Sequence, residues 1–437
     1  MTQSNNPAVH AAGRATLEIF ISSIIGIGCI DYKLINQTTI SALSSTTYKI
    51  LLPMFLGTNI IKTITKTNGL TKSSLTLPLL ASVQSFILYM ITTKIIFPLL
   101  LLLDDVDGNI VDINTIRNSD DGRGISICSS FGNGGVVPLI FCESLFGRSS
   151  GSSSGSSSND LLALSTGCVA LFLVGWSPFF WSFGRSILLG NDNDTDNNEN
   201  NNSVNANVIS SKDKAITKLK SMLPPPVIGV FIGMIIATIP IIRRLFITNN
   251  NDVGASGPLF GVVFDTMQNF GKAASPLSLL VLVSSLALGA GFGGSANTTG
   301  STTGTKSKSK LLSSTSTVTA IYEIPFWKRW GIVSFMRFII SPIVMYSLLK
   351  IVSLPQIGLI DSYKTDNKGA VYTSMIWFIC ILESIMPPAQ NQVTLLHVAN
   401  KTNKANEMAT FLFFIYTTSM IPLVIILSMA LQKFQLI

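Results

Sequence analysis

Long apolar runs divide this chain of 437 residues, and they constrain its fold more than any other feature. A helix of about 20 apolar residues crosses the hydrocarbon core of a bilayer, where backbone polar groups find their partners inside the helix. We find ten such runs, so the sequence predicts about ten transmembrane helices. Their approximate ranges are 15–31, 40–61, 76–103, 124–146, 160–185, 224–245, 258–292, 329–353, 370–397 and 405–432.

The composition agrees with this prediction. Charged residues make up 12% of the chain and hydrophobic residues 47%, whereas an ordinary soluble domain carries about 25% charged residues. So few charges cannot cover a water-facing surface, which argues against a soluble enzyme, a disordered protein or a nucleic-acid-binding protein, despite a pI of about 9.2. The fold class predicted is an all-α polytopic membrane protein, with the lipid bilayer as its surroundings.

A polar segment separates the first five runs from the last five. We therefore expect a first five-helix repeat at 15–185, a polar cytosolic linker at 186–223, and a second repeat at 224–432. Because five crossings are an odd number, the second half enters the membrane from the opposite face, as in the inverted repeats of secondary transporters. Ser-rich and Asn-rich stretches in the linker and in two other inserts favour flexible loops.

Two of the ten runs are interrupted, and they hold the same position in each half. In the fourth run FGNGG (131–135) precedes Pro138, and in the ninth run IMPPAQN (385–391) interrupts the apolar sequence. A pair of segments broken by glycine or proline at matching positions indicates a transporter binding site. We expect Asn133 to lie close to Pro388, across a cavity.

The prolines have specific consequences for the backbone. A proline donates no hydrogen bond to the carbonyl four residues before it. Pro138 therefore frees the carbonyl group of Gly134, and Pro387 with Pro388 frees those of Glu383 and Ser384. Ordinary kinks, with polar residues capping the loose backbone, are the alternative interpretation.

Proline also suits the first turn of a helix, so a half-helix is expected to start near Pro388. The amides at such a start lack acceptors and carry partial positive charge, which attracts carboxylates. Two half-helix starts that face each other would form an anion site near the bilayer midplane. The predicted substrate-binding residues are Asn133, Gly134, Pro138, Pro387, Pro388, Gln390 and Asn391.

Three charged residues lie inside the runs, where such residues are functional candidates. Glu143, Arg337 and Glu383 are candidates for charge neutralisation or ion coupling. Arg337 either neutralises an acid or faces an anion, or it reaches the interface. Glu383, Pro387 and Asn391 are spaced by four and share one helix face if the break is mild. Two histidines and five dispersed cysteines predict no metal site, and no cofactor is expected.

These segments resemble the auxin efflux carrier family, in particular its PIN-like branch with a short central loop. GNGGVVPLIFCESLF (132–146), MRFIISPIVM (336–345) and PPAQNQVTLLHVAN (387–400) carry the resemblance most clearly. It implies ten helices in two inverted five-helix repeats, with crossed, broken fourth and ninth helices, a scaffold and a transport domain, and an elevator-like motion. It also implies that Asn133, Gln390 and Asn391 contact the substrate. Gly134, Gly135 and two inserts, at 104–123 and 293–320, depart from the family pattern.

The function expected is secondary transport of small organic anions, with auxin-like indole carboxylates such as indole-3-acetic acid implied by the resemblance. The alternatives are a carrier of another carboxylate or an amino acid, and a receptor or scaffold of the same fold that does not transport. The chain has few residues of the types that usually carry catalysis, with two histidines and five dispersed cysteines, which argues against an enzyme. The resemblance places the chain in the endoplasmic reticulum membrane, with the plasma membrane as the alternative. A homodimer is the assembly to consider, and nucleic acid is not an expected partner.

Overall fold

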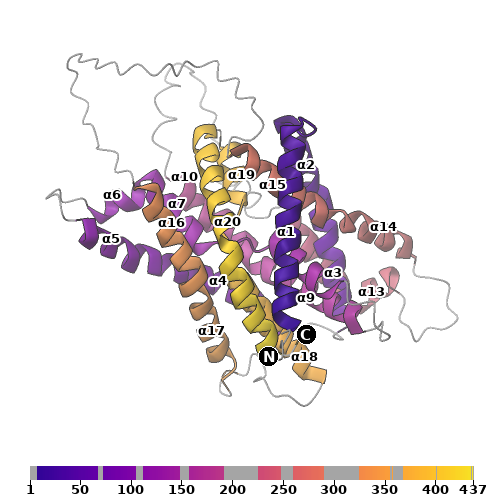
Figure 1. The fold of residues 1–437 in the computed structure, drawn as a ribbon. Helices are drawn as coiled ribbons and strands as arrows, with labels where there is room; N and C mark the ends of the chain where they lie inside the picture. The colour runs from indigo at the N-terminus through magenta and orange to yellow at the C-terminus, as the bar shows by residue number, and fades with distance from the viewer. Residues whose placement is uncertain are drawn as a thin grey trace, which may run out of the picture.

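The protein is described by a computed structural model, shown as a ribbon in Figure 1. All described residues belong to helices or to short connections, and no named strand occurs among them. The structure describes residues 7–66, 72–104, 112–147, 157–190, 225–247, 259–289, 324–354, 357, 368–399, 401–434 and 436. The predicted linker 186–223 and the insert at 293–320 lie almost wholly outside these ranges.

Helices cover all five predicted runs of the first half. Three of them continue through a short π-helical segment, a local widening that helices tolerate as a single turn. Their bounds are α1 Pro7–Asp31, α2 Gln37–Thr46, η1 Thr47–Leu51, α3 Leu52–Lys66, α4 Lys72–Ile91, η2 Thr92–Ile96, α5 Phe97–Asp104, α6 Ile113–Asn118, α7 Asp120–Ser130, α8 Val136–Phe146, α9 Ser157–Phe179, η5 Phe180–Gly184 and α10 Arg185–Leu189.

Helices also cover the five predicted runs of the second half. One of them, the eighth, contains a π-helical segment. Their bounds are α12 Pro225–Thr238, α13 Pro240–Phe246, α14 Gly261–Lys272, α15 Ala274–Gly289, α16 Phe326–Phe335, η7 Met336–Ile340, α17 Ser341–Val352, α18 Lys368–Ser384, α19 Asn391–Val398 and α20 Thr402–Lys433.

Four helices in the described residues are long and apolar enough to cross a membrane: Leu75–Leu101, Leu161–Leu189, Phe326–Val352 and Glu407–Lys433. A fifth is added if α12 and α13, which meet at an angle of 105°, form one span. Two shorter apolar helices, Val137–Phe146 and Val371–Ser384, belong to the fourth and ninth runs. The fold is therefore that of a helical, polytopic membrane protein.

Three details differ from the sequence-based expectation. The first helix starts at Pro7 rather than near residue 15, and α7 starts at Asp120, ahead of the predicted fourth run at 124–146 and preceded by the short helix α6. The sixth run is not one straight span, because Ile239 is extended and Pro240 begins a new helix. A residue that precedes proline is driven out of the helical conformation, which accounts for the sharp bend.

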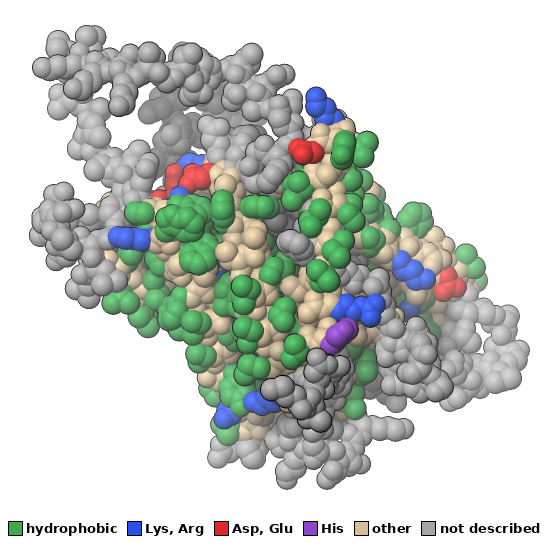
Figure 2. Space-filling model, viewed as in Figure 1, with side chains coloured by type: hydrophobic (Ala, Val, Ile, Leu, Met, Phe, Trp, Pro, Cys, Tyr) green, Lys and Arg blue, Asp and Glu red, His purple; other side chains and the backbone are tan. Residues whose placement is uncertain are grey.

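The outer surface of the bundle is apolar along much of its length. Along α17 and α20, for example, Ile343, Ile421 and Met429 have exposed fractions of 58%, 72% and 64%. Figure 2 shows hydrophobic side chains over this face, with lysine, arginine and acidic side chains mainly toward its ends. An exposed apolar band of this kind is suited to lipid rather than to water.

Helix packing gathers the elements into two sets. One set contains α1, α3, α12, α14 and α15, and the other contains α4, α7 to α9 and α16 to α20; the two sets are in extensive contact, through α1 and α15 with α20 and through α3 with α9. In the first set α3 and α12 approach closely at glycines: a Cβ at Gly233 would lie 2.6 Å from the carbonyl oxygen of Gly57. Small residues allow such close contacts between membrane helices. Helices α1 and α20 pack side by side across the two sets, and α1 begins at the end of the bundle where α20 finishes (Figure 1).

A charged cluster ties together the starts of α7, α16 and α20. Arg329 pairs with Asp121, and its guanidinium is 2.9 Å from the Glu407 carboxylate. The backbone amide of Ile324 donates to Asp121 at 2.7 Å. Asp120 pairs with Lys404 and with Arg123. Partial burial acts to raise the pKa of Asp120, but hydrogen bonds from Lys404 and Arg123 outweigh it and hold this pKa below its usual value.

Candidate functional site

The two helix breaks meet in the structure and pair through their backbones. Gly132 and Pro388 form an isolated antiparallel bridge. The amide of Asn133 donates to the carbonyl of Pro387 at 2.7 Å, and the amide of Ala389 donates to the carbonyl of Phe131 at 3.0 Å. We call this arrangement, formed by residues 131–135 and 385–390, the crossing. The predicted proximity of Asn133 and Pro388 is confirmed, although direct pairing takes the place of the expected separation across a cavity.

Two side chains bind the carbonyl groups that the prolines free. The Arg337 guanidinium lies 3.4 Å from the Glu383 carbonyl oxygen, and its Nε donates to the Met386 carbonyl at 2.9 Å. Ser341 donates to the Ser384 carbonyl at 2.7 Å. The two carbonyls predicted to be free, those of Glu383 and Ser384, are thus both contacted by side chains.

Arg337 is buried, which excludes the alternative that its side chain reaches the membrane interface. Its side chain is only 2% exposed, so it does not reach toward an interface. It lies in η7, between α16 and α17, and contacts the end of α18. The guanidinium places a buried positive charge at the crossing.

Gln84 and Tyr416 extend this network to two further helices. The side-chain amide of Gln84, in α4, donates to the Ser341 hydroxyl at 2.9 Å. The hydroxyl of Tyr416, in α20, accepts from the Asn133 side-chain amide at 2.8 Å and donates to the Pro388 carbonyl at 3.0 Å. Tyr416 therefore joins both breaks and fixes the orientation of the Asn133 side chain.

Replacing Tyr416 with Phe is expected to lower the thermal unfolding midpoint of the purified protein. The substitution leaves the buried Asn133 amide and the Pro388 carbonyl without a partner, and each unpaired buried group costs about 1–3 kcal/mol. Tyr32→Phe is the matched control, because Tyr32 is 82% exposed. Equal midpoints for the two variants would show that the Tyr416 hydroxyl does not hold the crossing.

Both half-helices start next to the crossing. Helix α8 begins at Val136, with Pro138 in its first turn, and α19 begins at Asn391. The first amides of a helix have no acceptor within it. Gln390 precedes α19, and its side-chain oxygen is buried without a hydrogen-bond partner among the described residues. The expected half-helix start near Pro388 is therefore confirmed.

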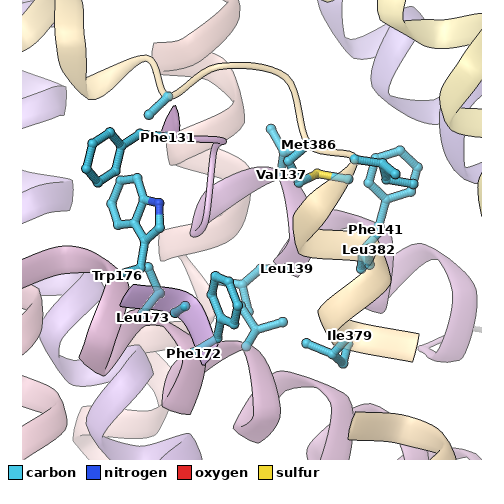
Figure 3. Packing of buried hydrophobic residues seen from close by; sticks show 14 of the residues in the cluster. Phe131, Val137, Leu139, Phe141, Phe172, Leu173, Trp176, Ile379, Leu382 and Met386 are labelled. Atoms are coloured by element: carbon cyan, nitrogen blue, oxygen red, sulfur yellow. The ribbon is translucent and has the colours of Figure 1, made fainter. Parts of the chain in front are cut away.

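An aromatic and aliphatic wall lines the crossing on the side of α9. A Cβ on Gly134 would lie 3.2 Å from the Trp176 ring, which is stacked on Phe180 with ring centroids 5.0 Å apart. Figure 3 shows Trp176 beside Phe131, with Val137 and Met386 across from them. The indole nitrogen of Trp176 is buried and has no hydrogen-bond partner in the described part of the chain.

The predicted residues divide into those at the crossing and those away from it. Glu383 is 3% exposed at the end of α18, directly before the break. Helix α18 ends at Ser384 and a new helix begins at Asn391, so Glu383, Pro387 and Asn391 do not share one continuous helix face as a mild break would require. Glu143 lies further along α8 and is half-buried. The crossing brings together Asn133, Gly134, Pro387, Pro388, Arg337 and Gln390.

Sequence reasoning missed four polar residues that hold the site. Gln84, Ser341 and Tyr416 form the network above, and Cys128 lies 3.0 Å from the side-chain oxygen of Gln392. Gln84, Ser341 and Tyr416 lie within the predicted apolar runs, so a search of those runs for hydroxyl and amide side chains could have included them. Their partners lie far away in the sequence and follow only from the fold.

Comparison with known proteins assigns the family. No curated protein sequence matches the chain. A family model described as "Membrane transport protein" matches residues 110–427, which is well over half of the 437 residues and includes both breaks. Members of this family are transporters rather than enzymes. The chain therefore belongs to the membrane transport protein family of auxin efflux carriers and PIN-like proteins, and is an integral membrane transporter.

Proposed function

We propose that the protein is a secondary transporter of small organic anions that binds its substrate at the crossing, with auxin-like indole carboxylates as the first substrates to test. The pairing of the two breaks carries this proposal, since it puts the starts of α8 and α19 beside each other. Helix starts stabilise negative charge. The buried guanidinium of Arg337 adds a positive charge to the same place.

Polar groups around the crossing suit a carboxylate. The Trp176 indole N–H is buried and unpaired in the described residues, and its ring packs against Gly134. Rotation of the Gln390 amide by a half-turn would present an N–H donor in place of its unpaired oxygen. Aromatic side chains nearby, including Phe131 and Phe180, favour a substrate with an apolar ring.

The proposed architecture has two inverted five-helix repeats, at 15–185 and 224–432. Breaks in the fourth helix of each half support it, as does the position of the start of α1 and the end of α20 at one end of the bundle (Figure 1). The set that includes α3 and α12 would form the scaffold, and the set that includes the crossing would move as the transport domain.

We propose a homodimer as the assembly. We propose the endoplasmic reticulum membrane as the location, with the plasma membrane as the alternative. Imaging of a fluorescent fusion protein in cells tests the location.

Uptake of labelled indole-3-acetic acid into proteoliposomes tests the substrate and the site. Asn133→Ala and Gln390→Ala are each expected to reduce uptake about tenfold, because a hydrogen bond to a charged group contributes about 1.5–3 kcal/mol. Asn269→Ala is the matched control, since Asn269 is exposed on α14 and lies outside the crossing. We expect this control to equal wild type.

Each outcome has a distinct meaning. Equal uptake by the wild type and both variants would remove Asn133 and Gln390 from the binding site. Uptake no higher than in empty liposomes would contradict the auxin proposal, and other labelled carboxylates and amino acids would then test the alternative carrier. Binding of indole-3-acetic acid without uptake would favour a receptor.

A further inference from the structure

Glu383 is a buried acidic residue whose carboxyl group takes no part in the hydrogen-bond network at the crossing. Its side chain is 3% exposed, and neither carboxylate oxygen has a hydrogen-bond partner among the described residues. The guanidinium of Arg337 contacts the Glu383 backbone carbonyl and the Met386 carbonyl. The Arg337 guanidinium therefore hydrogen-bonds to backbone oxygens, and the Glu383 carboxyl group has no direct partner among the described residues.

A carboxylate that is buried and unpaired loses its hydration without compensation. Burial of this kind favours the neutral acid, with a proton on one oxygen, over the carboxylate. The other titratable groups whose charges act on it are Arg337 from η7, Cys142 from α8 and Cys380 from α18 itself. Both cysteines are buried thiols, so Arg337 carries the one fixed charge in this set.

Charge balance at the crossing links this proton to the substrate. A monoanion bound beside Arg337 makes the buried site neutral only when Glu383 is protonated. If Glu383 were ionised, two negative charges would compete for one guanidinium in a low-dielectric site, which is costly. Anion binding and proton binding therefore favour each other, as thermodynamic linkage requires.

We propose that Glu383 is a proton-binding site that couples the transported anion to a proton. The proton passes from water on the side of loading to a Glu383 carboxylate oxygen, stays there while the site is occluded, and returns to water on the side of release, so no bond other than that O–H bond forms or breaks. This inference rests on the proposed transport function. It names the coupling ion of that site, which the family assignment leaves open.

The test measures labelled indole-3-acetic acid uptake against pH in proteoliposomes at zero membrane potential, with the signal of empty liposomes subtracted at every pH. Wild-type uptake at low substrate concentration is expected to fall toward tenfold per pH unit on the alkaline side, the limit for one coupled proton. Glutamine is a neutral substitute for the protonated acid. The uptake rate of Glu383→Gln is therefore expected to change less than about twofold per pH unit over the same pH range. Asp265→Asn, at an exposed position of α14, is expected to keep the wild-type pH profile.

Four results would overturn the proposal. Three of them are a Glu383→Gln variant that keeps the wild-type pH profile, a Glu143→Gln variant that loses this profile in place of Glu383→Gln, and wild-type uptake that depends on sodium rather than on protons, as measured by replacing sodium with choline. A pH-independent wild type would overturn it as well, while leaving the transport function intact.

Infrared spectroscopy of the substrate-free protein tests whether Glu383 carries a proton, and it does not depend on a transport assay. The wild type is expected to show the band of a protonated carboxyl group at about neutral pH, and Glu383→Gln is expected to lose it. Asp265→Asn is expected to keep the band. Absence of the band from the wild type would overturn the proposal even if uptake were normal. If the wild type moved no indole-3-acetic acid, the proposed function would fail for that substrate, and the infrared result would still stand for Glu383.

Discussion

A Gly132→Ala variant is expected to lose transport and to unfold at a clearly lower temperature than the wild type. A Cβ at Gly132 would overlap the guanidinium of Arg337 and lie 3.2 Å from the Met386 carbonyl oxygen. Arg337 cannot yield freely, because it is buried and bonded to two carbonyl groups. Displacing it leaves those carbonyls unpaired, so we expect a loss of about 2–4 kcal/mol in the free energy of unfolding.

Neighbouring glycines provide matched controls for this prediction. At Gly135 a Cβ would lie 3.7 Å from the Leu173 side chain, an ordinary contact, so Gly135→Ala is expected to resemble the wild type. At Gly134 the nearest atom is 3.2 Å away in the Trp176 ring, so Gly134→Ala is expected to fall between the two. Thermal unfolding of the purified variants measures the series. Equal midpoints for Gly132→Ala and Gly135→Ala would contradict the described packing of Arg337 against Gly132.

Replacing Arg337 with Met is expected to have the second large effect. The change removes the donors to the Glu383 and Met386 carbonyls and the buried positive charge that attracts the anion. We expect about 3 kcal/mol lower stability and a fall in anion uptake of more than about tenfold. Arg337→Lys keeps the charge but lacks the planar fork that reaches two carbonyls, so it is expected to retain part of the uptake.

Arg244→Met is the control for this prediction, since Arg244 is exposed on α13. It removes the same charge at a position far from the crossing in the fold, and its uptake and unfolding midpoint are expected to match the wild type. An Arg337→Met variant with normal uptake would show that the guanidinium does not attract the substrate. Normal stability with reduced uptake would separate its electrostatic effect from its effect on packing.

The sequence predicted the backbone chemistry of the site better than its side chains. Proline has no amide hydrogen, so the freed carbonyls of Glu383 and Ser384 followed directly from Pro387 and Pro388. The donors to these carbonyls, Arg337 and Ser341, were not predictable by the same reasoning. They lie more than 40 residues away in sequence, and only the packing of η7 and α17 against α18 brings them there.

The errors of the sequence analysis have physical causes of the same kind. The shared helix face of Glu383, Pro387 and Asn391 was conditional on a mild break, and this condition is not met, because the pairing of Gly132 with Pro388 needs extended backbone and α18 ends at Ser384. The bend between α12 and α13 carried a local signal in Pro240, which the apolar residues around it concealed. Tyr416 joins Asn133 across 283 positions of sequence, so no local pattern indicates it.

A cryo-electron microscopy map of the purified protein with indole-3-acetic acid tests the central claim most directly. We expect the breaks to be paired at Gly132 and Pro388, and ligand density to lie between the starts of α8 and α19, in contact with Asn133 and Gln390. The same map of Asn133→Ala is expected to lack this density. Ligand density elsewhere with an empty crossing, or breaks that lie apart, would contradict the account.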